Sequence, residues 1–110
     1  MASLNLHPLP LSGDLSLRSI AELHIQLTRA IDGHEAIAVG TDGVDSIDAA
    51  TLQLLVSAAR TAAARGRQLS LAAPADGPVA RALVAAGFFT ADGTPKVPSL
   101  SSWTIVREAA

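Results

Sequence analysis

The chain has 110 residues, a length that suits one domain with one core and is too short for two ordinary ones. Hydrophobic residues make up 49% of it but aromatic residues only 3%, so Leu, Val, Ile and many Ala must fill the interior. Eight basic residues against ten acidic ones give a net charge of −2. This balance excludes the strong positive field with which proteins bind nucleic acids and anionic membrane surfaces.

Cysteine is absent, which excludes disulfides, thiol nucleophiles and thiolate metal sites. No apolar run approaches the roughly 20 residues that span a bilayer. The N-terminus also lacks the basic region and apolar stretch of a signal peptide. We therefore expect a cytoplasmic protein without membrane insertion.

Two short strands are the first expected elements. Residues 4–11 form an extended apolar segment, and Pro8 and Pro10 within it lack N–H donors, which confines a strand there to an edge or an end. Gly13-Asp14 is typical of a tight turn. Residues 15–17 then alternate apolar and polar side chains as a short second strand does.

A first helix is predicted after this strand pair. Ser19 and Glu22 have the spacing of a capping box, in which the two side chains bond each other's backbone N–H groups. Apolar residues then recur at helical spacing as far as Ile31, and Gly33 follows as a C-terminal stop. We expect an amphipathic helix lying on the core.

Strands and helices alternate through the middle of the chain. Residues 36–39 form a short apolar strand without alternating charge, which is typical of a central strand. A helix is predicted over residues 49–65, a strand over 68–73, and a further helix from Pro78 to a stop at Gly87. This alternation predicts parallel pairing and an α/β layer architecture.

Residues 90–110 differ in character. Gly93, Pro95 and Pro98 interrupt the first half, which we interpret as an irregular segment. The stretch 103–106 then has the composition of a strand and contains the only Trp of the chain. We expect it to pack as an edge strand or as a cover over the core, and a partner-binding strand is the alternative.

The sharpest strand-to-helix signal is Val44-Asp45-Ser46-Ile47-Asp48-Ala49-Ala50-Thr51-Leu52-Gln53-Leu54-Leu55. Asp48 stands at the expected N-cap, where its carboxylate accepts a bond from the first turn and meets the positive end of the helix dipole. This stretch resembles the signature of the STAS family, the domain of the bacterial anti-sigma factor antagonists. In that family an Asp is followed by Ser or Thr, a small residue, Gly and Leu at the start of a helix.

The resemblance covers about residues 4–89 and continues outside the signature. Ser12-Gly13-Asp14-Leu15 is similar to the turn after the family's strand pair, and residues 65–71 are similar to its helix-to-strand turn. The resemblance implies a STAS-like layered fold, a mixed β-sheet of four to five strands with helices packed on it. We expect a single domain over residues 1–110, with its core at about 4–89 and a tail at 90–110.

One position departs from the family pattern. The antagonists are phosphorylated by an anti-sigma kinase on the Ser or Thr that directly follows the Asp, and here that residue is Ala49. Thr51 and Ser46 are alternative acceptors outside the usual position. The resemblance implies that the start of the helix binds the partner, through Asp48, Ala49, Ala50, Thr51 and Leu52.

Chemistry other than binding has little support. Asp42, Asp45 and Asp48 are spaced by three, which does not match the ligand pattern of a calcium loop. The three histidines are scattered, and we interpret them as surface residues. The chain lacks both a Gly-x-Ser-x-Gly elbow and a Gly-rich phosphate loop followed by Lys. We therefore expect no catalysis, cofactor or metal.

Two functions from different classes remain. In the first, the chain is a regulatory module that binds an anti-sigma factor kinase or a related signalling protein. In the second, it resembles the small STAS subunit of a bacterial lipid-transport ABC complex and binds the transporter ATPase without a phosphorylation cycle. A ligand-binding sensory role is a third alternative and requires a cavity. A homodimer is compatible with either protein-binding role.

Overall fold

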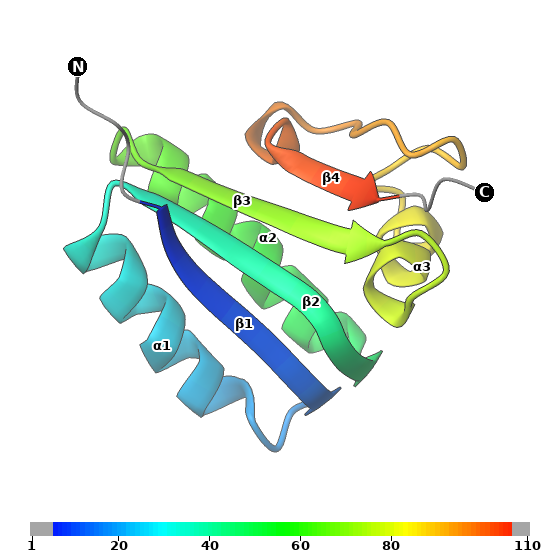
Figure 1. Cartoon of the computed structure of the whole chain (residues 1–110), viewed down its shortest axis with the longest axis horizontal. Coiled ribbons are helices and arrows are strands. Elements are labelled where there is room, and N and C mark those ends of the chain that lie inside the picture. The colour runs from blue at the N-terminus through cyan, green and yellow to red at the C-terminus, as the bar shows by residue number, and fades with distance from the viewer. Residues whose placement is uncertain (1–5, 107–110) are drawn as a thin grey trace.

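A computed structural model describes residues 6–106 (Figure 1). Strands and helices alternate along the chain. In order they are β1 (Leu6–Leu15), α1 (Ile20–Gly33), β2 (Ala36–Ile47), α2 (Ala49–Ala64), β3 (Gln68–Pro74), α3 (Pro78–Ala85), a short 3-10 helix η1 (Pro98–Leu100) and β4 (Trp103–Val106).

The four strands lie side by side in the order β1-β2-β3-β4, and every neighbouring pair is parallel (Figure 1). Because each connection steps one strand in the same direction with the same handedness, all the helices fall on one face of the sheet. The contacts agree: α1 packs beside α2, α2 packs on β3, and α3 packs on β2 and β3. The predicted α/β layered fold is thus confirmed.

The expected mixed sheet is entirely parallel in residues 6–106, because the predicted strand pair at its start is one strand. Gly13, with φ +78°, does not reverse the chain. It accompanies register shifts between Pro10 and Ser12 and between Gly13 and Asp14, and β1 continues to Leu15. Leu4, predicted at the beginning of this strand, lies outside the described residues.

β2 also extends further than the expected strand at residues 36–39. It pairs with β1 as far as Ile47 and carries one extra residue at each of the two register shifts, so Gly40 to Gly43 are strand residues. Thr41 lies in the interior at 2% exposure, and its hydroxyl donates to the carbonyl of Ala72 at 2.9 Å. The polar composition of this segment is therefore accommodated within the sheet.

The core lies between the sheet and its single helical layer. Ile37, Val39 and Leu71 project from the strands into it. The buried side of α2 carries larger apolar residues in its first half and three alanines, Ala58, Ala59 and Ala62, in its second half. Small side chains let α2 lie close to the sheet. The two large buried aromatic side chains, Phe89 and Trp103, come from the segment after α3.

The helix ends follow the predictions in part. α2 begins after Asp48 and ends at Ala64, and Gly66, with φ +71°, follows the C-cap residue Arg65. At α1 the predicted capping box is wrong: Ser19 makes no capping bond, and its hydroxyl instead donates to the carbonyl of Ser16 at 3.2 Å. The Ser19 hydroxyl is thus used in a hydrogen bond within the turn before α1 and does not cap the helix.

The C-terminal strand matches its prediction. β4 pairs in parallel with β3, and the indole Nε1 of Trp103 donates to the carbonyl of Leu69 at 3.1 Å. Leu100 in η1 is fully buried and packs under α2. This segment therefore completes both the sheet and the core.

Candidate functional site

Asp48 joins three parts of the chain at the start of α2. One carboxylate oxygen, Oδ1, accepts the N–H of Thr51 at 2.8 Å and caps the helix. The other, Oδ2, accepts the N–H of Leu17 at 2.9 Å, from the turn after β1. The backbone N–H of Asp48 donates to the carbonyl of Leu15 at 3.0 Å. Asp48, which was predicted as a cap, therefore also links α2 by hydrogen bonds to the turn between β1 and α1.

These donors hold the pKa of the Asp48 carboxyl below its usual value of 3.8. The side chain of Thr51 contributes most, although its hydroxyl lies outside regular hydrogen-bond geometry. The N–H groups of Thr51 and Leu17 act in the same direction, because each favours the ionised carboxylate. Asp48 is thus a fixed negative charge at neutral pH.

The five predicted site residues divide into two groups. Ala49 is exposed and Asp48 and Ala50 are half-buried, so this part of the first turn is accessible to a partner. Thr51 is 0% exposed and Leu52 is 3% exposed, because both face the core. Their side chains position the helix and present no surface in this structure.

The two alternative phosphoacceptors differ in the same way. Ser46 is exposed at the end of β2, and its hydroxyl donates to the carboxylate of Asp14. The hydroxyl of Thr51 is enclosed and has no hydrogen-bond partner. Of the two, only Ser46 presents its hydroxyl to an approaching enzyme.

Leu17 is a surface feature that the sequence analysis did not assign to the site. It was expected in a strand, but it lies in the turn between β1 and α1 and is 67% exposed. Its N–H donates to Asp48, so its backbone is fixed beside the start of α2. The signal in the sequence was weak, since a single exposed Leu is common on protein surfaces.

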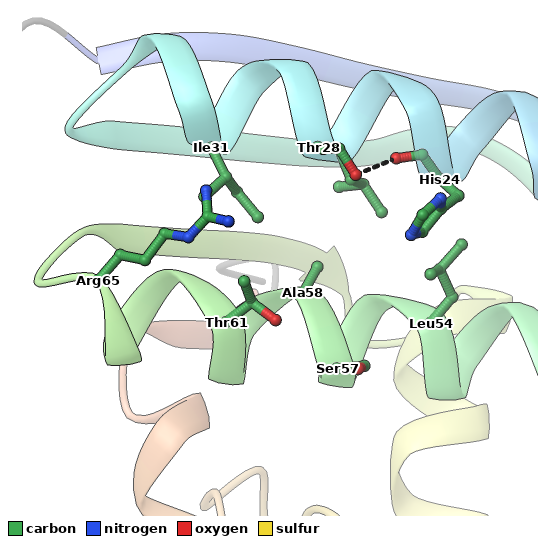
Figure 2. Close-up of a pocket in the computed structure, with 9 residues that line it drawn as sticks. His24, Thr28, Ile31, Leu54, Ser57, Ala58, Thr61 and Arg65 are labelled. Atoms are coloured by element: carbon green, nitrogen blue, oxygen red, sulfur yellow. Dashed lines mark hydrogen bonds between the residues drawn. The ribbon is translucent and has the colours of Figure 1, made fainter.

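A groove of about 300 Å³ runs between α1 and α2 (Figure 2). Its floor is apolar and its rim carries hydroxyl groups and two basic side chains. Figure 2 shows its labelled residues, His24, Thr28, Ile31, Leu54, Ser57, Ala58, Thr61 and Arg65. The Arg65 guanidinium pairs with the carboxylate of Asp32 in the last turn of α1, so its charge is already compensated.

The three histidines are scattered in the sequence, but two of them lie together in the structure. His7 and His34 stack with their ring centroids 3.8 Å apart and their planes 6° from parallel, because the starts of β1 and β2 are adjacent. His24 is exposed on α1. Among the residues that the structure describes, no three His, Cys, Asp or Glu side chains come together to hold a metal ion.

The chain matches one known protein family over most of its length. A family model described as "Mlab, STAS domain" matches residues 3–90. The chain belongs to the STAS domain family. No curated protein matches it. Within residues 6–106, no helix of this STAS domain is long and apolar enough to cross a bilayer.

Membership in the family gives the general role. STAS domains are regulatory modules that bind other proteins and are in general not enzymes. The matched region begins before β1 and ends shortly after α3, so it contains Asp48 and the start of α2. The segment that carries η1 and β4 follows it.

Proposed function

We propose that this STAS domain is a non-enzymatic regulatory module that binds a partner protein in the cytoplasm through the start of α2. The observation that carries the proposal is the way Asp48 holds that helix start. Its carboxylate bonds both Thr51 and Leu17, which leaves Ala49 exposed on a fixed first turn. Small side chains at positions 49 and 50 let a partner approach the backbone closely.

The first candidate partner is an anti-sigma factor kinase or a related signalling protein, as for the antagonists that the sequence resembles. Phosphorylation of such a surface adds about −1.5 to −2 charges and changes docking. Ala49 has no hydroxyl to accept a phosphate, and Thr51 is enclosed. Binding by this chain is then constitutive, and any control lies elsewhere.

The second candidate partner is the ATPase of a bacterial lipid-transport ABC complex, to which this chain would bind as an accessory subunit. The same observation favours it, since a permanent subunit needs no phosphorylation cycle at its contact surface. The exposed Leu17, whose N–H bonds the Asp48 carboxylate, adds apolar area that suits a lasting contact. The two candidates use one surface and differ in the protein that is captured.

Affinity capture from native lysate, with mass spectrometry of the bound proteins, tests the proposal. The bait is the wild-type chain beside Ala49→Asp, which places a negative charge where the family's phosphate is attached. Ala64→Asp, exposed at the other end of α2, is the matched control. We expect the wild type and the control to retain the partner and Ala49→Asp to release most of it.

The identity of the captured protein decides between the candidates. A histidine-kinase-like anti-sigma factor supports the antagonist role, and an ATPase recovered with its permease supports the accessory-subunit role. Equal retention by all three baits would show that the start of α2 is not the contact surface.

A further inference from the structure

A small polar pocket lies between the C-terminal half of α2, the start of β3 and the segment around η1, and has a volume of about 190 Å³. The η1 segment follows the family match at residues 3–90, so the pocket lies partly outside the matched domain. Its polar lining residues are Arg67, Gln68, Ser99, Ser101 and Ser102. Guanidinium, amide and hydroxyl groups thus line one pocket, and all of these groups can donate hydrogen bonds.

The wall formed by the η1 segment is held in place by contacts within the protein. The hydroxyl of Ser102 donates to the carbonyl of Leu69 at 3.1 Å, and the indole of Trp103 donates to the same carbonyl at 3.1 Å. Leu100 is fully buried where η1 packs on α2. A ligand therefore meets a largely preformed pocket, which lowers the cost of ordering on binding.

Ser99 provides the observation that points to a ligand. Its hydroxyl is buried and has no hydrogen-bond partner among residues 6–106. Burying a hydroxyl without a partner is costly, and the large majority of such groups bond to protein or to a bound molecule. A serine hydroxyl moves between staggered positions by rotation about one bond. A ligand in the pocket that Ser99 lines can therefore supply the missing partner.

Arg67 gives the pocket a positive charge. Its Nη1 donates to the carbonyl of His34 at 2.8 Å, which uses one of the five N–H groups of the guanidinium and leaves the others for a ligand. Within residues 6–106 no carboxylate pairs with Arg67, and no described Asp or Glu lines the pocket. Glu35 lines a neighbouring pocket with Arg67 and is exposed to solvent. The charge of the pocket therefore favours an anionic ligand.

We propose that this pocket binds a phosphate group, carried by inorganic phosphate or by a small phosphate ester. A phosphate accepts hydrogen bonds on all sides, so it can bond Arg67 at the start of β3 and Ser99 in η1 together. A carboxylate has only two oxygens and matches fewer of the donors. The volume of about 190 Å³ limits the ligand to a phosphate with a short substituent. Because one cation carries the charge, the dissociation constant falls in the millimolar range.

Nuclear magnetic resonance of the isotope-labelled full chain tests the proposal, with chloride replaced stepwise by inorganic phosphate at constant pH and ionic strength. We expect saturable shifts of the backbone amide signals of residues 67–69 and 99–102. Arg67→Gln should raise the phosphate dissociation constant by about tenfold or more, because it removes a charge-assisted hydrogen bond. Arg60→Gln, which removes an exposed charge on α2 outside the pocket, is the matched control and should bind as the wild type does.

Ser99→Ala is a second variant, for the case that Arg67→Gln loses its bond to His34 and does not fold. It removes the unpartnered hydroxyl, so phosphate affinity should fall by about fivefold while the stability of the free protein does not decrease. Loss of affinity in either folded variant, with retention in Arg60→Gln, supports the site. Shifts that stay linear throughout the titration overturn the proposal. Equal weakening by Arg60→Gln and Arg67→Gln, or unchanged affinity in both folded pocket variants, also overturns it.

The same titration with glycerol 3-phosphate distinguishes the two sources of the phosphate group. Tighter binding than that of inorganic phosphate assigns the pocket to a phosphate ester, and equal or weaker binding assigns it to free phosphate. None of these outcomes depends on the partner proposed at the start of α2.

Discussion

At the scale of single residues, Asp48 determines how stability changes with pH at the start of α2. Its folded pKa lies below the usual value of 3.8, so its contribution is complete above that pH and is lost as the pH falls through the folded pKa. We expect Asp48→Ala to lower the free energy of unfolding at pH 7, and the difference from wild type to shrink below about pH 3.8.

Urea unfolding at pH 7 and at pH 3 measures this effect of Asp48. Asp45→Ala is the control, because Asp45 is exposed in the same segment and its substitution removes the same charge. A constant difference between Asp48→Ala and wild type at both pH values would show that the carboxylate's hydrogen bonds do not stabilise the fold.

Ala49 and Thr51 should respond in opposite ways to a negative charge. Ala49→Asp puts the charge on an exposed first turn near the positive end of the helix dipole, so stability should stay within about 1 kcal/mol of wild type. Thr51→Asp puts it in a site that is 0% exposed, and we expect a loss of about 3–5 kcal/mol. Thermal unfolding followed by circular dichroism compares the two. Equal stability of the two variants would contradict the burial of Thr51.

The sequence alone indicates part of this difference in burial between Ala49 and Thr51. Thr51 is followed at helical spacing by Leu55, Ala58 and Ala62, all of which are buried, so its position on the inward side of α2 follows from periodicity. The hydrogen bond between Leu17 and Asp48 could not be predicted from the sequence. It joins residues 31 positions apart and depends on how the turn after β1 lies against the start of α2. Local patterns identified the cap, and only the tertiary structure shows its second bond.

At the scale of secondary-structure elements, α2 depends on its small inward side chains. Ala62 is 0% exposed where α2 packs on the sheet, so Ala62→Leu adds three carbon atoms to a filled space. We expect a loss of about 1–3 kcal/mol from overpacking. Ala64→Leu at the exposed end of the same helix is the control and should lie close to wild type. Urea unfolding measures both, and an undiminished stability of Ala62→Leu would indicate free space beneath α2.

The elements also show where local patterns fail. The bounds of α2 and β3 were predicted within one residue, because helical periodicity, the cap at Asp48 and Gly66 all agree. The strand at the beginning of the chain was not predicted correctly. Gly13 and Asp14 fit a tight turn locally, but in the structure they continue β1 opposite a bulge in β2. Pairing with a neighbouring strand overrides turn propensity in this segment.

At the scale of the whole molecule, the segment that carries η1 and β4, which follows the family match at residues 3–90, should unfold together with the matched part. Trp103 is 2% exposed, its indole donates to β3, and Leu100 is fully buried under α2. Because these contacts complete the core, we expect Trp fluorescence and helical circular dichroism to report one urea transition with the same midpoint. The single Trp of the chain makes the fluorescence specific to this segment. An earlier fluorescence transition would mean that η1 and β4 detach from a core that is stable without them. In that case residues 90–110 would be an appendage to the STAS domain, and the predicted single unit over residues 1–110 would be wrong.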